Sequence, residues 1–132
     1  RTIANSVIAE KGVYDVLLID ADGNITEGSR TNIFFIKNNT VYTAPASDVL
    51  VGITRKKLTE IMTEKQLVWY EQKIPFAQIQ EFDAAFITGT SPKILPISTI
   101  IPDIKFNTNN NHLRLLQQLY DKEIETYVNR RL

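Results

Sequence analysis

A β-hairpin is predicted by the stretch Ile33-Phe-Phe-Ile-Lys-Asn-Asn-Thr-Val-Tyr-Thr43. Residues 33–36 form an uninterrupted apolar run, and residues 41–43 form a second β-prone segment. Asn38 and Asn39 lie between the two runs, and asparagine tolerates the positive φ that a tight turn requires. This stretch therefore predicts two adjacent antiparallel strands.

Further strands are expected on either side of this hairpin. Apolar or β-branched runs predict them over residues 13–19, 67–71, 84–88 and 94–101. Pro96 interrupts the last run, so we expect an edge strand or a bent strand there. The predicted strands are spread along most of the chain, which points to one sheet rather than a helical bundle.

Three helices are expected from hydrophobic periodicity. Ile3, Val7 and Ile8 are spaced like one face of a helix that Gly12 would end. The second helix is expected over residues 54–65, and the third follows a polar run of asparagines near the C-terminus. Their inner faces are expected to carry Leu58, Ile61 and Met62 in the second helix, and Leu113, Leu116, Tyr120, Ile124, Tyr127 and Val128 in the third.

The composition favours a single globular domain of 132 residues, of which 43% are hydrophobic and 23% charged. The mixed order of strands and helices predicts an α/β or α+β class with a mostly antiparallel sheet. Fifteen basic and fifteen acidic residues give a formal net charge of zero, which argues against nucleic-acid binding and membrane binding. The lack of cysteine and the single histidine argue against a metal site. His112 itself is expected at the surface or as a helix cap.

The ends of the chain suggest a fragment or a processed product, because it starts with Arg1 and its one methionine is Met62. No apolar run approaches the roughly 20 residues that a membrane span needs. The first ten residues also lack the apolar core of a signal peptide. A targeting signal on a missing part stays open, and the location that we expect is cytoplasmic.

A calcium loop is suggested by Asp20, Asp22 and Asn24 but fails at two essential places. Such a loop needs glycine at its sixth position and glutamate at its twelfth. This chain has Ile25 and Thr31 there. The acidic stretch is therefore predicted to be a solvated turn between strands.

The start of the second helix leaves two interpretations open. Gly52 precedes a first turn in which residues 55–57 are all cationic, although the positive end of the helix dipole disfavours cations. The three side chains could simply be solvated. Alternatively, the free backbone amides of Ile53 and Thr54 hold an anion, assisted by the positive charge.

Four motifs together resemble those of the class IV aminotransferases, the pyridoxal-phosphate enzymes of fold type IV. This family includes branched-chain aminotransferases, D-amino-acid aminotransferases and 4-amino-4-deoxychorismate lyases. The similarity runs from about residue 8 to about residue 101 and implies the family's C-terminal cofactor-binding domain, a pseudo-barrel sheet with flanking helices. The motifs are Thr26-Glu-Gly-Ser-Arg-Thr-Asn-Ile-Phe-Phe-Ile-Lys37, Tyr42-Thr-Ala-Pro45, Leu50-Val-Gly-Ile-Thr-Arg55 and Phe86-Ile-Thr-Gly-Thr-Ser91 with Leu95-Pro-Ile97.

The resemblance implies a role for each matching residue at a pyridoxal 5'-phosphate site. Glu27 matches the carboxylate that pairs with the pyridine nitrogen, and Leu50 matches the apolar residue on the ring face. Asn32 is expected to stabilise the loop around Glu27. Ile53 and Thr54 match the helix start whose amides hold the cofactor phosphate, and Thr90 matches a hydroxyl that contacts the same phosphate. Ser91 matches a position close to the substrate carboxylate.

Two departures from the family pattern limit what this chain can do. The family's Schiff-base lysine lies before the segment that matches the N-terminus, hence upstream of Arg1. Lys11 is the nearest candidate but matches a non-catalytic position. The chain alone is therefore expected to be inactive, with an N-terminal domain missing. Pro92 and Lys93 also differ from the small residue and acid usual in branched-chain enzymes.

The resemblance implies a homodimeric aminotransferase that uses an amino acid and a 2-oxo acid as substrates. Two other functions stay open. A lyase of the same family would release pyruvate and an aromatic amine. A non-catalytic relative would bind a phosphorylated ligand or another protein.

Overall fold

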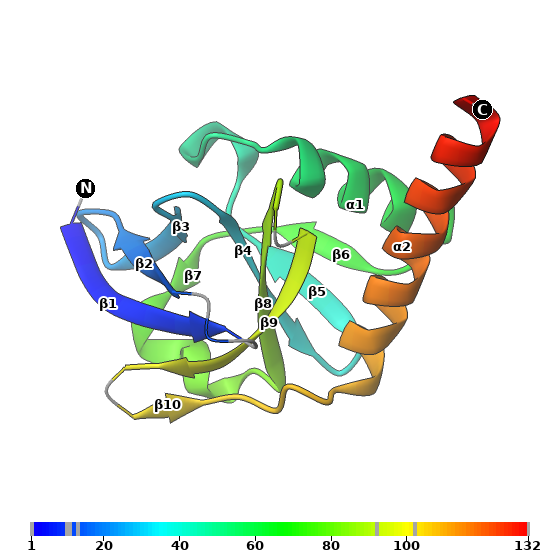
Figure 1. Cartoon of the computed structure of the whole chain (residues 1–132). Coiled ribbons are helices and arrows are strands. Elements are labelled where there is room, and N and C mark those ends of the chain that lie inside the picture. Colours follow the sequence, from blue (N-terminus) through cyan, green and yellow to red (C-terminus); the bar gives the residue numbers. More distant parts are fainter. Residues whose placement is uncertain (1, 10–11, 13, 92, 102, 132) are drawn as a thin grey trace.

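The fold is described from a computed structural model that places residues 2–9, 12, 14–91, 93–101 and 103–131. Within these residues ten strands are spread along the chain, with one α-helix in the middle and a longer one at the C-terminus (Figure 1). In chain order the elements are β1 (Thr2–Ala9), β2 (Tyr14–Ile19), β3 (Asn24–Gly28), β4 (Asn32–Lys37), β5 (Thr40–Thr43), η2 (Ala46–Asp48), α1 (Ile53–Glu64), β6 (Trp69–Glu71), β7 (Ile74–Pro75), η3 (Phe76–Glu81), β8 (Ala84–Gly89), β9 (Lys93–Ile100), β10 (Ile104–Lys105) and α2 (Asn111–Arg131).

The strands form one curled sheet. Their order is β6-β5-β4-β8-β9-β1-β2-β3-β7, and β10 pairs with β9. Every described pair is antiparallel except β5 with β6. Figure 1 shows the sheet curling round, with α1 and α2 together on the side of β4, β5 and β8. The predicted class, a mostly antiparallel sheet with flanking helices, is confirmed.

The hairpin predicted around Asn38 and Asn39 joins β4 to β5. Both asparagines have positive φ, 50° and 61°. The Asn38 amide also donates to Asp83 Oδ2 at 2.9 Å, which ties the turn to the start of β8. The turn therefore has the left-handed backbone for which asparagine is suited.

Other predicted elements lie close to their expected places. The helix expected over residues 54–65 is α1 (Ile53–Glu64), and the strand expected over residues 84–88 is β8. The strand expected over residues 67–71 is shorter, since β6 begins at Trp69. The acidic turn near Asp20 is present, with Asp20 Oδ1 accepting from the amides of Asp22 and Asn24. The strand β3 that follows it was not predicted.

The predicted N-terminal helix is wrong, because residues 2–9 form strand β1. Hydrogen bonds to β2 on one side and β9 on the other hold this segment extended. Val7 and Ala9 are both buried, which is the two-residue alternation of a strand. Tertiary pairing outweighs the local helical spacing here, helped by the β-branched Ile3, Val7 and Ile8.

Strand β9 lies between β8 and β1 inside the sheet. Of the two predictions for this segment, the edge strand is therefore wrong and the bent strand fits. Residues 93–96 pair with β8, whereas residues 97–100 pair with β1. Pro96 stands at the change of partner, where its missing amide breaks no described β1 pair. Proline therefore marks the point at which the strand passes from one part of the sheet to the other.

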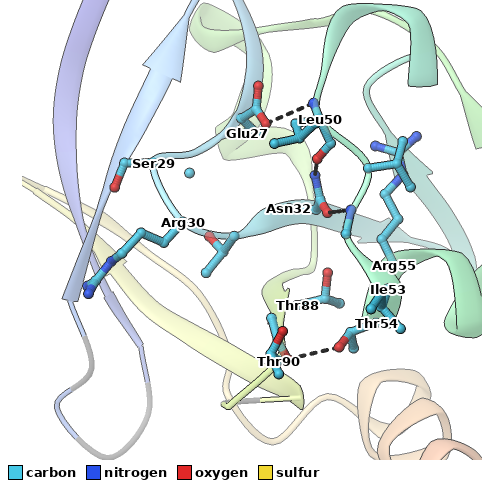
Figure 2. A pocket seen from close by; sticks show the side chains of 15 residues that line it. Glu27, Ser29, Arg30, Asn32, Leu50, Ile53, Thr54, Arg55, Thr88 and Thr90 are labelled. Atoms are coloured by element: carbon cyan, nitrogen blue, oxygen red, sulfur yellow. Dashed lines mark hydrogen bonds between the residues drawn. The ribbon is translucent and has the colours of Figure 1, made fainter.

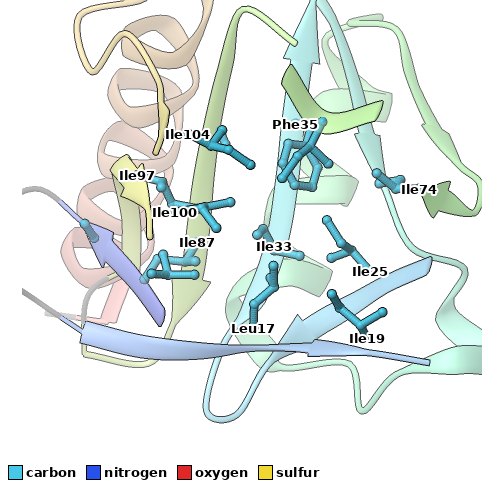
Figure 3. Close-up of a cluster of buried hydrophobic side chains, with 14 of the residues drawn as sticks. Leu17, Ile19, Ile25, Ile33, Phe35, Ile74, Ile87, Ile97, Ile100 and Ile104 are labelled. Atoms are coloured by element: carbon cyan, nitrogen blue, oxygen red, sulfur yellow. The ribbon is translucent and has the colours of Figure 1, made fainter. Parts of the chain in front are cut away.

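The sheet carries a hydrophobic cluster on each face. Along β4, Ile33 and Phe35 belong to one cluster, while Phe34 and Ile36 belong to the other. Figure 3 shows the first cluster, between the curled ends of the sheet. In the second, Phe34 stacks on Phe86 with ring centroids 4.9 Å apart. The continuous apolar run of β4 follows from this burial on both faces, and the helical residues of the second cluster are Leu58, Ile61, Met62, Leu113, Leu116 and Tyr120.

The last turns of α2 extend past the sheet (Figure 1). The residues predicted to form the inner face of α2 do pack on the sheet as far as Ile124, which contacts the second cluster. Tyr127 and Val128 were predicted to face inward, but they lie near the C-terminal end of α2 and are 52% and 48% exposed. In the part of the chain described, neither helix is both long and apolar enough to cross a membrane.

His112 is buried, which corrects its predicted place at the surface or as a cap. Its side chain is 8% exposed, and its Nε2 has no hydrogen-bond partner. The cap is provided by Asn110, whose Oδ1 accepts from the Leu113 amide at 3.0 Å. Burial lowers the pKa of His112 below its ordinary value.

We expect acidification from about pH 7.5 to about pH 5.5 to lower the free energy of unfolding. In the unfolded chain His112 takes up a proton near pH ~6.5, while in the folded chain it stays neutral to lower pH. The unfolded state then binds more protons, so stability falls as the pH drops through this window. The chain has one histidine and no cysteine, so few other groups titrate there. Urea unfolding at both pH values should show the loss in the wild type and little of it in His112→Leu, and an equal loss in both would contradict the assignment.

Candidate active site

A cavity of about 460 Å³ opens where three chain segments meet (Figure 2). The segments are residues 27–32 at the end of β3, residues 50–55 at the approach to α1, and residues 88–90 at the end of β8. Its volume lies within the range of roughly 300–1,000 Å³ that small-molecule pockets occupy.

The structure brings together five of the six residues that sequence analysis expected to contact the cofactor or substrate, and Asn32, expected to support the site, lines the same cavity. Among the described residues, Ser91 does not line the cavity, although its neighbour Thr90 does. Lys11 and Pro92 lie outside the described residues. The five residues on the cavity wall are Glu27, Leu50, Ile53, Thr54 and Thr90.

Glu27 places a carboxylate on the wall of the cavity. The end of β3 holds it, and its side chain is 6% exposed. The Leu50 amide donates to its Oε1 at 3.2 Å. This bond joins β3 to the approach to α1. The Glu27 carboxylate can also accept a hydrogen bond from a cationic N–H group in the cavity.

Asp15 organises the loop that follows Glu27, a role that sequence analysis missed. Its carboxylate accepts hydrogen bonds from the Ser29 amide at 3.1 Å, the Arg30 amide at 3.3 Å and the Thr31 hydroxyl at 2.6 Å. Burial alone would raise the pKa of Asp15. The hydrogen bonds, which also include those from the Ser29 hydroxyl and the Val16 amide, stabilise the ionised carboxylate more strongly, so the pKa is lowered. The sequence feature that could have indicated this role is an acidic residue within an otherwise apolar strand, Tyr14-Asp-Val-Leu-Leu-Ile19.

Gly28 lies against this network more closely than any other residue type could. A Cβ at this position would overlap Thr31 Oγ1 and Asp15 Oδ2 and would stand 3.0 Å from Asp15 Cγ. The Gly28 amide donates to the Thr31 carbonyl at 2.9 Å, which closes the loop. A glycine next to Glu27 is therefore required by close approach.

Asn32 holds the approach to α1 in place. Its Nδ2 donates to the Leu50 carbonyl at 3.1 Å, and its Oδ1 accepts from the Gly52 amide at 2.9 Å. We predicted that it would stabilise the loop around Glu27. Its amide bonds instead span β4 and residues 50–52, which lie 18 to 20 residues further along the chain.

The N-terminus of α1 faces the cavity without a side-chain cap. Gly52 occupies the cap position, and the first turn has no acidic residue. The Thr54 hydroxyl donates to the Gly89 carbonyl at 2.9 Å, and the Ile53 side chain is 82% exposed. Amides in the first turn of a helix have no acceptor within it. They are therefore suited to bind an anion.

The three cations of this first turn differ in their surroundings, and Arg55 is neither solvated nor free to assist an anion. Its side chain is buried, with Nη2 donating to the Ala44 carbonyl at 2.8 Å and lying 3.8 Å from Glu71 Oε2. Burial lowers its pKa, while the nearby carboxylates of Glu71 and Glu27 oppose that shift. Lys57 lies 3.9 Å from Glu123 on α2, and Lys56 is exposed.

Comparisons with known proteins identify the family of this chain. Residues 1–100 match the family described as amino-transferase class IV. A probable branched-chain-amino-acid aminotransferase of Rickettsia typhi is 44% identical over 89 residues, which are 67% of this chain and 31% of that protein. The chain thus spans about a third of the length of such relatives.

Two solved structures share the fold. An aminotransferase from Brucella abortus bound to the cofactor PLP has a TM-score of 0.73 and 26% identity, covering 82% of this chain and 38% of its own. A candidate 4-amino-4-deoxychorismate lyase from Legionella pneumophila has a TM-score of 0.75 and 28% identity, covering 82% and 40%. With three quarters of its residues matching the family pattern, the chain belongs to the class IV aminotransferases.

Proposed function

We propose that the protein containing this chain is a pyridoxal-phosphate-dependent aminotransferase that transfers an amino group between an amino acid and a 2-oxo acid. In this proposal residues 1–132 are its cofactor-binding domain. The observation that carries it is that the carboxylate of Glu27 and the open N-terminus of α1 belong to one cavity. Pyridoxal phosphate has a basic ring nitrogen at one side and a phosphate at the other, so it can occupy both.

The residues on the cavity wall fit this cofactor. When bound, pyridoxal phosphate supplies an electron-withdrawing ring that stabilises negative charge developing on the substrate. Glu27 accepts a hydrogen bond from the protonated ring nitrogen and keeps that proton in place. Leu50, whose side chain is 85% exposed, offers an apolar surface to one face of the ring.

The phosphate is proposed to lie at the start of α1. The amides of Ile53 and Thr54 donate to its oxygens, and the positive end of the helix dipole favours its charge. The Thr90 hydroxyl adds a further donor at the end of β8. Ser91 is proposed to lie near the substrate carboxylate, just outside the cavity lining.

The remaining parts of the proposal concern the rest of the protein. The Schiff-base lysine is expected upstream of Arg1, in an N-terminal domain that completes the site. The chain by itself is then inactive, and the complete enzyme is a cytoplasmic homodimer. These expectations come from the family, because the matched part of this chain covers only 31% of one such relative.

The proposal is tested with the full-length protein that contains this chain. After incubation with pyridoxal phosphate and removal of the excess, we expect a visible absorption band that borohydride reduction abolishes. Amino transfer from an amino acid to a 2-oxo acid should then be measurable. A protein that shows no band and no transfer would contradict the proposal.

A lyase is the second candidate, because the Legionella structure shares the fold as closely as the aminotransferases do. A lyase would release pyruvate from its substrate when no 2-oxo acid acceptor is present. Pyruvate release under that condition, without amino transfer, would favour the lyase.

A further inference from the structure

Thr88 carries a buried hydroxyl that no group in the protein satisfies. Its side chain is 1% exposed, and its Oγ1 has no hydrogen-bond partner. Most buried polar side-chain atoms in proteins do have a partner, so an exception needs a reason. The proposed function gives Thr88 no role, although it lines the cavity.

The position of Thr88 directs the hydroxyl toward the start of α1. In the register of β4 with β8, Thr88 is the partner of Asn32, so the two side chains share one face of the sheet. Asn32 binds Gly52, and the residue after Thr88 binds the Thr54 hydroxyl. Figure 2 shows Thr88 in the space between Asn32 and Ile53–Thr54.

The polar groups around Thr88 are already engaged with one another. Asn32 Oδ1 accepts from the Gly52 amide at 2.9 Å, and its Nδ2 donates to the Leu50 carbonyl. The Gly89 carbonyl accepts from Thr54 at 2.9 Å. None of these groups forms a hydrogen bond with Thr88, and Thr88 lines the cavity, so a partner can reach it from there. Because the uncapped helix start favours negative charge there, that partner is an anionic oxygen.

We propose that Thr88 is a further ligand-binding residue, whose hydroxyl donates to an oxygen of a phosphate group held at the N-terminus of α1. The phosphate then receives donors from two sides, the helix amides and the floor of the sheet. That the phosphate belongs to pyridoxal phosphate rests on the proposed function. The phosphate site itself rests on the unpaired Thr88 hydroxyl and the uncapped start of α1.

The test compares Thr88→Val with Thr88→Ser in the full-length protein. Valine keeps the shape of threonine and removes the hydroxyl, while serine keeps the hydroxyl. We expect Thr88→Val to weaken the affinity for pyridoxal phosphate roughly 10- to 100-fold, to weaken inorganic phosphate binding as well, and to leave the affinity for unphosphorylated pyridoxal unchanged. Thr88→Ser should bind all three like the wild type.

Thermal unfolding without ligand supplies a readout that does not depend on activity. Removing an unpaired buried hydroxyl should leave the melting temperature of Thr88→Val equal to or above that of the wild type. The matched control is Thr43→Val, because the buried Thr43 hydroxyl donates to the Ile33 carbonyl at 2.7 Å and accepts from Arg55. Thr43→Val should melt at a lower temperature. An equal fall in Thr88→Val would overturn the proposal.

The remaining outcomes separate this proposal from the proposed function. A wild-type protein that binds inorganic phosphate but not pyridoxal phosphate would refute the proposed function. The role of Thr88 would still be supported if Thr88→Val lost the inorganic phosphate. Wild-type affinity of Thr88→Val for both phosphate ligands would overturn the role of Thr88 alone. A wild-type protein that binds neither ligand would overturn both.

Discussion

Replacing Glu27 with alanine in the full-length protein is expected to reduce turnover by about a hundredfold or more. A hundredfold loss corresponds to about 2.7 kcal/mol in the activation barrier. The charge that holds the ring proton would be lost, and no other acid lines the described part of the cavity. The expected loss of unfolding free energy is smaller, about 1.5 kcal/mol, the lower end of the range for a hydrogen bond to a carboxylate, because the bond from the Leu50 amide at 3.2 Å is removed.

Glu27→Gln separates the charge of this side chain from its shape. Glutamine has nearly the same volume, and its amide oxygen can still accept from the Leu50 amide at the position of Oε1. We therefore expect a turnover loss similar to that of Glu27→Ala, with a urea midpoint close to that of the wild type. If Glu27→Gln kept full turnover while Glu27→Ala lost stability and turnover together, Glu27 would be a structural residue.

Gly28→Ala is expected to lower the free energy of unfolding by about 2–4 kcal/mol, the largest stability effect that the site predicts. The new Cβ would enter the space between Asp15 and Thr31, where a hydrogen bond of 2.6 Å now joins the two side chains. Hydrogen bonds to an ionised carboxylate are worth roughly 1.5–3 kcal/mol, and the overlap disrupts more than one contact. The loop beside Glu27 would shift, so affinity for pyridoxal phosphate should fall as well.

Urea unfolding measures this effect, and two further variants control it. Gly23→Ala, at a glycine with φ of 83° and nothing within 4 Å, isolates backbone strain and should cost about 1 kcal/mol. In an Asp15→Ala background the overlap with the carboxylate is gone, and the Thr31 hydroxyl, which no longer has Asp15 as its acceptor, is free to rotate away from the new Cβ. Gly28→Ala should then cost much less than it does alone, because contacting residues are not additive. Additive costs in the double variant would show that Asp15 is not what excludes a side chain at Gly28.

Local patterns were enough to predict several elements of the sheet. The hairpin at Asn38 and Asn39 depends on neighbouring residues alone, since asparagine tolerates positive φ. The inner face of α1 follows from the spacing of Leu58, Ile61 and Met62. These features need no information about distant segments.

The errors arose where distant segments decide the local structure. Residues 2–9 have helical spacing but are extended, because β2 and β9 pair with both sides of them. His112 was placed at the surface because its sequence neighbours are polar, yet α2 buries it as the helix packs on the sheet. Tyr127 and Val128 continue the apolar spacing of α2 into its last turns, where both side chains are exposed.

The cavity shows the same division. The residue types near Glu27, Ile53 and Thr90 can be read from short motifs, because a carboxylate, a helix start and a hydroxyl are local features. Their convergence on one cavity, the glycine requirement imposed by Asp15 and the unpaired hydroxyl of Thr88 arise only when β2, β3, β8 and α1 come together. Close approach and hydrogen bonding between segments far apart in the chain depend on the folded geometry, which no short stretch of residues contains.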